Sequence, residues 1–243
     1  MADAGVGPGD RVLEVGAGLG SLTVALAEAG CGVTALEIDP RVAEVLREIV
    51  SGYPNVDVRV QDAMRADWAS LLGAEPWAMV SNLPYNVSVP LLLELLQTVP
   101  AIECYLVMVQ REVGERLVAE PGSRAYGAVS VRVAYRAGAR IVRRVPADVF
   151  WPRPNVDSVL VRMEPGPSSV GVDPMALFAV VDEGFAERRK TMANALRRLG
   201  LSSDRANEVL HDAGLEPATR AERLSLDAFA RVATAMLEGG WSA

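Results

Sequence analysis

An amide, a proline and an aromatic ring stand together in Asn82-Leu83-Pro84-Tyr85, directly after the apolar residues 78–80. Such an apolar run predicts a buried strand, and open α/β sheets bind their ligands at the carboxyl ends of their strands. The tetrad 82–85 is therefore the candidate reaction centre of this chain. The alternative is an ordinary turn after a strand, because Asn and Pro are both common in turns.

The residue types of the tetrad suit methylation of an exocyclic nitrogen on a planar base. The lone pair of such a nitrogen is delocalised into the ring, so the nitrogen is a poor nucleophile until acceptors hold its N–H groups. The side-chain oxygen of Asn82 and the carbonyl oxygen of Leu83 can be these acceptors. Pro84 stiffens the turn because its φ is fixed, and the ring of Tyr85 can stack on a base taken out of its helix.

A glycine-rich segment near the N-terminus has the pattern of a nucleotide-binding loop. Residues 11–15 predict a buried strand, residues 16–20 read Gly-Ala-Gly-Leu-Gly, and apolar residues then recur at helical spacing. Ser21 stands where a dinucleotide fingerprint has its third glycine, so the pattern after Glu14 instead resembles motif I of the S-adenosylmethionine-dependent methyltransferases. A tight turn between strand and helix is the alternative. The candidate cofactor-binding residues are Gly16, Gly18 and Gly20.

Two carboxylates follow the next two predicted strands. Glu37 ends the strand predicted at 33–36, at a spacing from the glycine loop that suits an acid accepting from both hydroxyls of a ribose. We prefer it to Asp39, which precedes a proline and is typical of a helix N-cap. Asp62 follows the strand predicted at 56–60 and can accept from an adenine amino group, with Ala63 beside it as a further candidate contact. A generic polar loop is the alternative for Asp62.

The order of the predicted elements indicates a doubly wound α/β sheet followed by a small all-helical domain. Further strands are predicted at 105–109 and 159–163, and residues 164–169 form a linker rich in Pro, Gly and Ser. Beyond it, apolar residues recur only at helical spacing. We expect residues 1–165 to form the sheet domain and residues 172–243 the helical domain.

With these motifs in order, the chain resembles the rRNA adenine N6,N6-dimethyltransferases, most closely the branch that modifies two adjacent adenines near the 3′ end of small-subunit (16S) rRNA. DNA adenine and protein glutamine methyltransferases share the chemistry of the tetrad, but not the last three of the matching groups. The matching segments are residues 14–23, 37–39, 82–86, 108–113, 119–123 with 126–127, 149–158, 188–191 and 223–226.

The resemblance implies a Rossmann-like class I methyltransferase domain with S-adenosylmethionine as its cofactor. It assigns cofactor contacts to Gly16, Glu37, Asp62 and Asn82, and gives Asn82 the target amine as well. It further implies that Tyr85 and Phe150 sandwich the flipped adenine. Phe150 opens the stretch Phe-Trp-Pro-Arg-Pro, whose prolines stiffen the loop that carries it.

The helical domain carries a group of cations that is a candidate RNA-binding surface. Five cations lie within about three helical turns, a spacing that brings them together if the segment is helical. A charge run is often only a solvated face, but in the family that this chain resembles the helical domain helps to hold the ribosomal subunit. The candidate RNA-binding residues are Arg188, Arg189, Lys190, Arg197 and Arg198.

Composition sets limits on the other partners. The net charge of −7 by itself argues against a nucleic-acid partner, unless cations cluster locally. Two cysteines without metal-ligand spacing and a single histidine, His211, predict no metal site. No apolar run reaches the length of a membrane span. We expect a cytoplasmic monomer that binds the small ribosomal subunit and no membrane.

Two other functions fit parts of the sequence. One is a large-subunit rRNA adenine methyltransferase that confers antibiotic resistance, against which residues 188–191 and 223–226 favour the small-subunit branch. The other is a non-catalytic ribosome-assembly or transcription factor that uses the same fold to bind RNA. Family members carry an upstream Gln-Asn-Phe-Leu-like segment over the cofactor, which is not found before residue 11 here. We therefore expect weakened affinity for S-adenosylmethionine.

Overall fold

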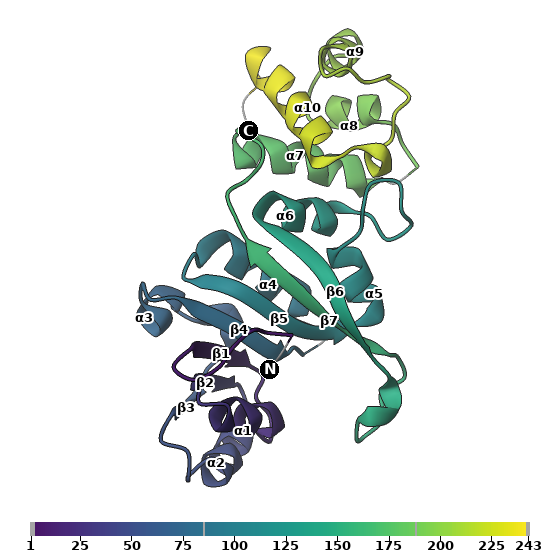
Figure 1. Cartoon of the computed structure of the whole chain (residues 1–243). Helices are drawn as coiled ribbons and strands as arrows, with labels where there is room; N and C mark the ends of the chain where they lie inside the picture. The colour runs from purple at the N-terminus through teal and green to yellow at the C-terminus, as the bar shows by residue number, and fades with distance from the viewer. Residues whose placement is uncertain (1–2, 85, 188, 242–243) are drawn as a thin grey trace. The chain divides into compact units, whose positions relative to one another are not determined.

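A seven-stranded mixed sheet is formed by strands that lie between residues 11 and 165 (Figure 1). The computed structural model describes residues 3–84, 86–187 and 189–241. The strand order is β3-β2-β1-β4-β5-β7-β6, in which β7 pairs antiparallel with both β5 and β6 and the other pairs are parallel. The strands are β1 Arg11–Val15, β2 Gly32–Glu37, β3 Val56–Val60, β4 Trp77–Asn82, β5 Ile102–Gln110, β6 Ala137–Val145 and β7 Ser158–Pro165.

Short helices connect the parallel strands, as expected for a doubly wound sheet. They are α1 Ser21–Glu28, α2 Pro40–Ile49, α3 Trp68–Leu72 and α4 Ser88–Thr98, and α5 Arg111–Leu117 follows β5. Asp39 is the N-cap of α2, where its carboxylate accepts from the backbone N–H of Arg41, as the sequence predicted. The predicted fold class is therefore confirmed for this part of the chain.

The chain divides into two compact units. The sheet unit comprises Met1–Glu115 and Ala137–Gly166, and the helical unit comprises Arg116–Arg136 and Pro167–Ala243. The helical unit thus includes residues 116–136, which the sequence placed in the sheet domain. The reason is burial, because the side chains of Tyr126, Val131 and Tyr135 belong to the core of the helical unit.

The helical unit is built around Phe229, which is fully buried. Its helices are α6 Ala128–Arg136, α7 Pro174–Ala186, α8 Met192–Arg198, α9 Ser203–Asp212 and α10 Leu226–Glu238. The side chain of Ser225 accepts from the N–H of Ala228, so the predicted cap of α10 is confirmed. Within the described part of the chain, no helix is both long and apolar enough to cross a membrane.

The sequence did not predict β6, the edge strand of the sheet. Its residues include a glycine and the three arginines Arg140, Arg143 and Arg144, so the apolar alternation of a half-buried strand is weak. Charged side chains are nevertheless typical of edge strands, because they discourage pairing with further chains. Arg143 is held by the carboxylate of Asp3, at 2.8 Å.

Candidate active site

The polar ends of the parallel strands meet where the strand order reverses, between β1 and β4. The β1–β4 ladder pairs Val12 with Ala78 and Leu13 with Met79. Farther along, the backbone N–H of Val15 donates instead to the buried hydroxyl of Ser81, at 2.9 Å. Ser81 thus joins the two strand ends immediately before the exposed Asn82.

The glycine loop contacts the tetrad. Gly16 has a φ of +75°, and a Cβ at this position would lie 3.0 Å from Cδ of Pro84 and 3.8 Å from the carbonyl oxygen of Asn82. A side chain would therefore both strain the backbone and push the tetrad away. Gly18 is also in the left-handed region, and no heavy atom lies within 4 Å of the position that a Cβ would take. The loop is therefore open to a ligand there.

Glu37 ties the glycine loop to the end of β2. Its carboxylate accepts three backbone N–H bonds, from Gly18 at 2.9 Å, Ile38 at 2.9 Å and Asp39 at 3.0 Å. A carboxylate has about four acceptor positions, so only about one remains for a ligand. If Glu37 accepts from both hydroxyls of a ribose, as predicted, one hydroxyl must therefore share an acceptor position with one of these backbone N–H groups.

Asp62 has a capping role in the structure. One carboxylate oxygen accepts from the N–H of Met64 at 2.9 Å, at the start of the 3₁₀ turn Ala63–Arg65. The other oxygen lies 3.7 Å from Nε of Arg65. The Asp62 side chain is 38% exposed and Ala63 is buried, so the carboxylate is accessible at the end of β3 while its neighbour is packed inside.

The first part of the tetrad is anchored by main-chain contacts and by burial. Leu83 is 1% exposed, and its N–H donates to the carbonyl of Met108 at 3.1 Å. The carbonyl of Pro84 accepts from the N–H of Ser88 at 3.2 Å, at the start of α4. The backbone that presents Asn82 and the Leu83 carbonyl is therefore held on both sides. Tyr85 lies outside the described residues.

Phe150 lies on the loop that leads into β7, at the same edge of the sheet. Asn82 pairs with Met108 on β5, and Gln110 at the end of β5 pairs with Ser158 at the start of β7. Only β5 separates β4 from β7, so the end of this loop, at Ser158, lies about 10 Å across the sheet from the end of β4. Phe150 itself is half-buried.

Sequence reasoning missed a buried carboxyl group beneath the glycine loop. Glu14 on β1 is 2% exposed and accepts from the hydroxyl of Thr23 on α1 at 2.6 Å. Burial raises the pKa of Glu14 to about 7, although the Thr23 hydrogen bond acts in the opposite direction. The available signal was an acidic residue between the apolar residues Leu13 and Val15 of a predicted buried strand. This hydrogen bond fixes the helix on one side of the loop to the strand on the other.

Two exposed apolar side chains at this edge were also missed. Leu19 in the glycine loop is 65% exposed, and Ile38, directly after Glu37, is 64% exposed. Leu19 follows β1 and Ile38 follows β2, and the last residues of both strands are buried. Exposed apolar side chains beside polar groups are typical of a site that binds a ligand with an apolar ring. The signal was an isoleucine where a turn usually places a polar residue.

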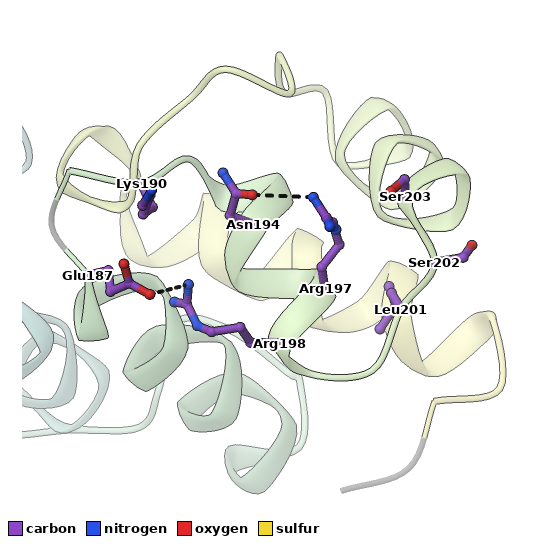
Figure 2. A pocket seen from close by; sticks show the side chains of 8 residues that line it. All are labelled: Glu187, Lys190, Asn194, Arg197, Arg198, Leu201, Ser202 and Ser203. Atoms are coloured by element: carbon purple, nitrogen blue, oxygen red, sulfur yellow. Dashed lines mark hydrogen bonds and ion pairs between the residues drawn. The ribbon is translucent and has the colours of Figure 1, made fainter.

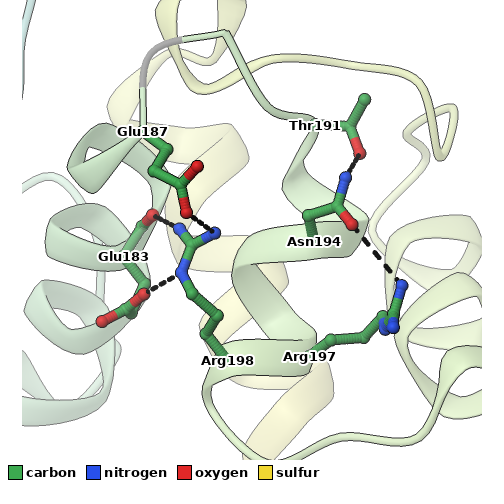
Figure 3. Close-up of polar contacts among 6 residues, drawn as sticks. All are labelled: Glu183, Glu187, Thr191, Asn194, Arg197 and Arg198. Atoms are coloured by element: carbon green, nitrogen blue, oxygen red, sulfur yellow. Dashed lines mark hydrogen bonds and ion pairs between the residues drawn. The ribbon is translucent and has the colours of Figure 1, made fainter.

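Four of the five predicted RNA-binding cations lie among the described residues of the helical unit, and their surroundings differ. Arg198 is held by two acids, Glu183 on α7 and Glu187 at the C-terminal end of that helix (Figure 3). Its Nε lies 2.6 Å from the Glu183 carboxylate, and its Nη1 lies 3.1 Å from the Glu187 carboxylate. It also donates to the Glu183 carbonyl at 2.6 Å. Arg198 therefore serves the packing of α8 on α7, and its charge is compensated.

Arg197 and Lys190 are exposed and line a cavity of about 580 Å³ with Asn194 (Figure 2). Arg197 makes one long hydrogen bond to the Asn194 side chain, at 3.5 Å, and Asn194 is itself oriented by Thr191. Arg189 is also exposed, whereas Arg188 lies outside the described residues. The structure thus separates the predicted cluster into a compensated arginine and exposed cations.

Comparison with known proteins decides the family. The model of the family described as "Ribosomal RNA adenine dimethylase" matches residues 1–237. The chain belongs to the ribosomal RNA adenine dimethylase family. It is 47% identical over 237 residues to "Ribosomal RNA small subunit methyltransferase A" of Thermobifida fusca, covering 95% of this chain and 82% of that protein. It is 45% identical over 242 residues to the Mycobacterium tuberculosis protein of the same name, covering 96% and 76%.

Solved structures of two methyltransferases have the same fold as this dimethylase. A dimethyladenosine transferase from Plasmodium falciparum has a TM-score of 0.83 at 25% identity and covers 98% of this chain and 94% of its own. The 23S rRNA methyltransferase ErmE has a TM-score of 0.73 at 26% identity and covers 96% and 93%. The predicted Rossmann-like methyltransferase fold and the assignment as an enzyme are confirmed.

The dimethylase uses S-adenosylmethionine, and the residues at the sheet edge fit this cofactor. Glu37 offers an acceptor for a ribose hydroxyl, the loop is open above Gly18, and Ile38 and Leu19 offer apolar surface for a ring. Among the described residues, no cluster of three or more His, Cys, Asp or Glu side chains is arranged to hold a metal ion.

Proposed function

We propose that this dimethylase transfers methyl groups to N6 of two adjacent adenines near the 3′ end of small-subunit (16S) rRNA. The observation that carries the proposal is the contact of Gly16 with Pro84, which joins the glycine loop to the tetrad. A cofactor on that loop and a base on the tetrad would be neighbours. The Thermobifida fusca and Mycobacterium tuberculosis relatives, which are named for the small subunit, share 47% and 45% identity with this chain, whereas ErmE shares 26%.

The cofactor would lie along the ends of β1, β2 and β3. Gly16, Gly18 and Gly20 would allow its close approach, and Glu37 would bind a ribose hydroxyl through its remaining acceptor position. Asp62 would accept from the adenine amino group beside Ala63, and Ile38 would cover the ring. The carboxylate oxygen of Asp62 nearer to Arg65 is the better candidate, because the other oxygen caps the 3₁₀ turn.

The target amine would be held by Asn82 and Leu83. In the first transfer, the Asn82 side-chain oxygen and the Leu83 carbonyl would each accept one N–H bond, which allows N6 to pyramidalise and direct its lone pair at the methyl group. N6 would bond to the methyl carbon as the carbon–sulfur bond breaks, and N6 would then lose one proton to solvent. S-Adenosylmethionine supplies that methyl group on a positively charged sulfur. The rigid Leu83–Met108 anchor keeps the acceptors in place, so positioning and exclusion of water would supply most of the acceleration. Tyr85 and Phe150 would sandwich the adenine.

Binding of the ribosomal subunit would involve the exposed cations of the helical unit. Arg189, Lys190 and Arg197 are accessible to phosphate. Arg188 remains a predicted RNA contact and lies outside the described residues. Arg198 is the weakest member, because two carboxylates already compensate it. We further propose that the enzyme acts as a monomer in the cytoplasm, where its ribosomal substrate is assembled.

The test is methyl transfer from labelled S-adenosylmethionine to purified ribosomal subunits that lack this modification. Small and large subunits are assayed separately, and the modified nucleosides are identified by mass spectrometry. Dimethyladenosine at two adjacent positions of the small-subunit RNA is the expected result. Methylated adenine only in large-subunit RNA would instead support the resistance-type activity. Binding to the small subunit without any transfer would support an assembly factor.

A further inference from the structure

Trp151 is the most exposed large apolar residue in the described part of the chain, at 96%. It lies on the loop between β6 and β7, which extends beyond these strands (Figure 1). Val149 at 64% and Val156 at 45% expose further apolar surface on the same loop. Tryptophan is mostly buried in folded proteins, and clustered exposed apolar side chains mark interaction sites.

The loop that carries Trp151 is stiff although its side chain is exposed. Pro146, Pro152 and Pro154 each fix a backbone dihedral angle. Asp157 joins the two ends of the loop, because its carboxylate accepts from the N–H of Ala147 at 3.1 Å. Its carbonyl accepts from the N–H of Arg111 at 3.0 Å, at the end of β5. The indole is thus presented by a preorganised loop.

The backbone at Phe150 is extended, with φ −105° and ψ 148°. Successive side chains of an extended backbone point to opposite sides. Phe150 is half-buried and Trp151 is exposed, in agreement with this alternation. A base held by Phe150 and a base held by Trp151 would therefore lie on opposite sides of one short segment, as adjacent nucleotides do when they are splayed apart.

We propose that Trp151 is a second stacking platform, which holds the base of the nucleotide next to the target adenine. The inference rests on the proposed function, because it takes Phe150 as the platform for the target. Single-stranded RNA is typically recognised by stacking on aromatic rings, and the exposed Arg153 on the same loop offers charge for the adjoining phosphate. The aromatic ring and the cation together favour a nucleotide as the occupant.

The test compares Trp151→Ala, Trp151→Phe and the control Val45→Ala, an exposed apolar residue on α2, in methylation of small subunits. Loss of one stacked base is expected to raise KM for the subunit about tenfold in Trp151→Ala, with kcat within about twofold of wild type. Trp151→Phe keeps an aromatic face and should stay within about threefold of the wild-type KM. Val45→Ala, away from this loop, should match wild type. An unchanged KM in Trp151→Ala would overturn the inference while the proposed function stands.

A second readout separates the two proposals. An RNA oligonucleotide with two adjacent adenines is titrated into wild type and Trp151→Phe, and tryptophan fluorescence is recorded. Stacking on Trp151 predicts quenching in wild type that is largely lost in Trp151→Phe. Equal quenching in both proteins would contradict the platform. If wild type transfers no methyl groups, the proposed function fails, and this titration alone decides whether Trp151 stacks on RNA.

Discussion

The sheet edge and the cation group of the helical unit differ in what positions their side chains. At the sheet edge, Glu37 and Leu83 are held by main-chain hydrogen bonds at the ends of parallel strands. In the helical unit, Arg197 and Arg198 are neighbours in sequence on one helix, yet only Arg198 meets acids of α7. Sheet topology therefore positions the first group, whereas tertiary partners decide the availability of each cation in the second.

Asn82→Ala tests the sheet edge most severely. Loss of the side-chain acceptor should lower kcat for methyl transfer about 10²- to 10³-fold, because a preorganised polar group acting on the reacting atom is worth this much. The measurement is the transfer rate at saturating small subunits. The control is Asn207→Ala, an exposed asparagine on α9, which should behave as wild type. Subunit binding by Asn82→Ala should be unchanged, and a large loss of binding would refute the assigned role.

Glu14 makes the sheet unit sensitive to pH. Burial raises its pKa from 4.5 to about 7, so the unfolded chain releases this proton at lower pH than the folded chain. The free energy of unfolding should therefore fall as pH rises from about 4.5 to 7, by about 3 kcal/mol for this group. Glu14→Gln cannot ionise and should lose this dependence. Denaturant unfolding of both proteins between pH 4 and 8 gives the difference, and a flat difference would contradict the prediction.

Glu37→Gln should weaken S-adenosylmethionine binding about 10- to 30-fold. The change removes the charge from hydrogen bonds to Gly18, Ile38 and Asp39, and a Gln amide group cannot accept from all three donors. Calorimetric titration with the cofactor measures the effect. Glu44→Gln, an exposed acid on α2, is the matched control. Equal cofactor affinity in the two variants would show that the cofactor does not use this strand end.

Arg197→Ala and Arg198→Ala should separate RNA contact from packing. Arg198→Ala is expected to lower the free energy of unfolding by about 1 kcal/mol, because it breaks partly exposed ion pairs with Glu183 and Glu187. Arg197→Ala should leave stability unchanged and raise Kd for the small subunit about threefold, with a weaker dependence on salt. Thermal unfolding and subunit binding measure both effects. Equal changes in stability and in subunit Kd for the two variants would show that Arg197 and Arg198 do not have separate roles in RNA contact and packing.

The sequence predicted those parts of the site whose positions depend only on the order of the strands along the chain. The glycine loop, Glu37 and Asn82 all follow apolar strands, so their meeting at one edge depends only on the parallel order of those strands. The buried Glu14–Thr23 bond was not predicted, because burial of a single acid depends on packing. β6 was missed because its arginines weaken the apolar alternation of a strand. Residues 116–136 were assigned to the sheet domain, whereas Tyr126, Val131 and Tyr135 pack in the core formed by the later helices.

The most direct test of this account is single-turnover methylation of unmodified small subunits by wild type, Asn82→Ala and Arg197→Ala, over a range of enzyme concentrations. We expect Arg197→Ala to reach the wild-type rate at high enzyme concentration, because only its binding is weakened. Asn82→Ala should stay slow at every concentration. Recovery of the wild-type rate by Asn82→Ala at high concentration would show that the tetrad serves binding, and would contradict its assignment as the reaction centre.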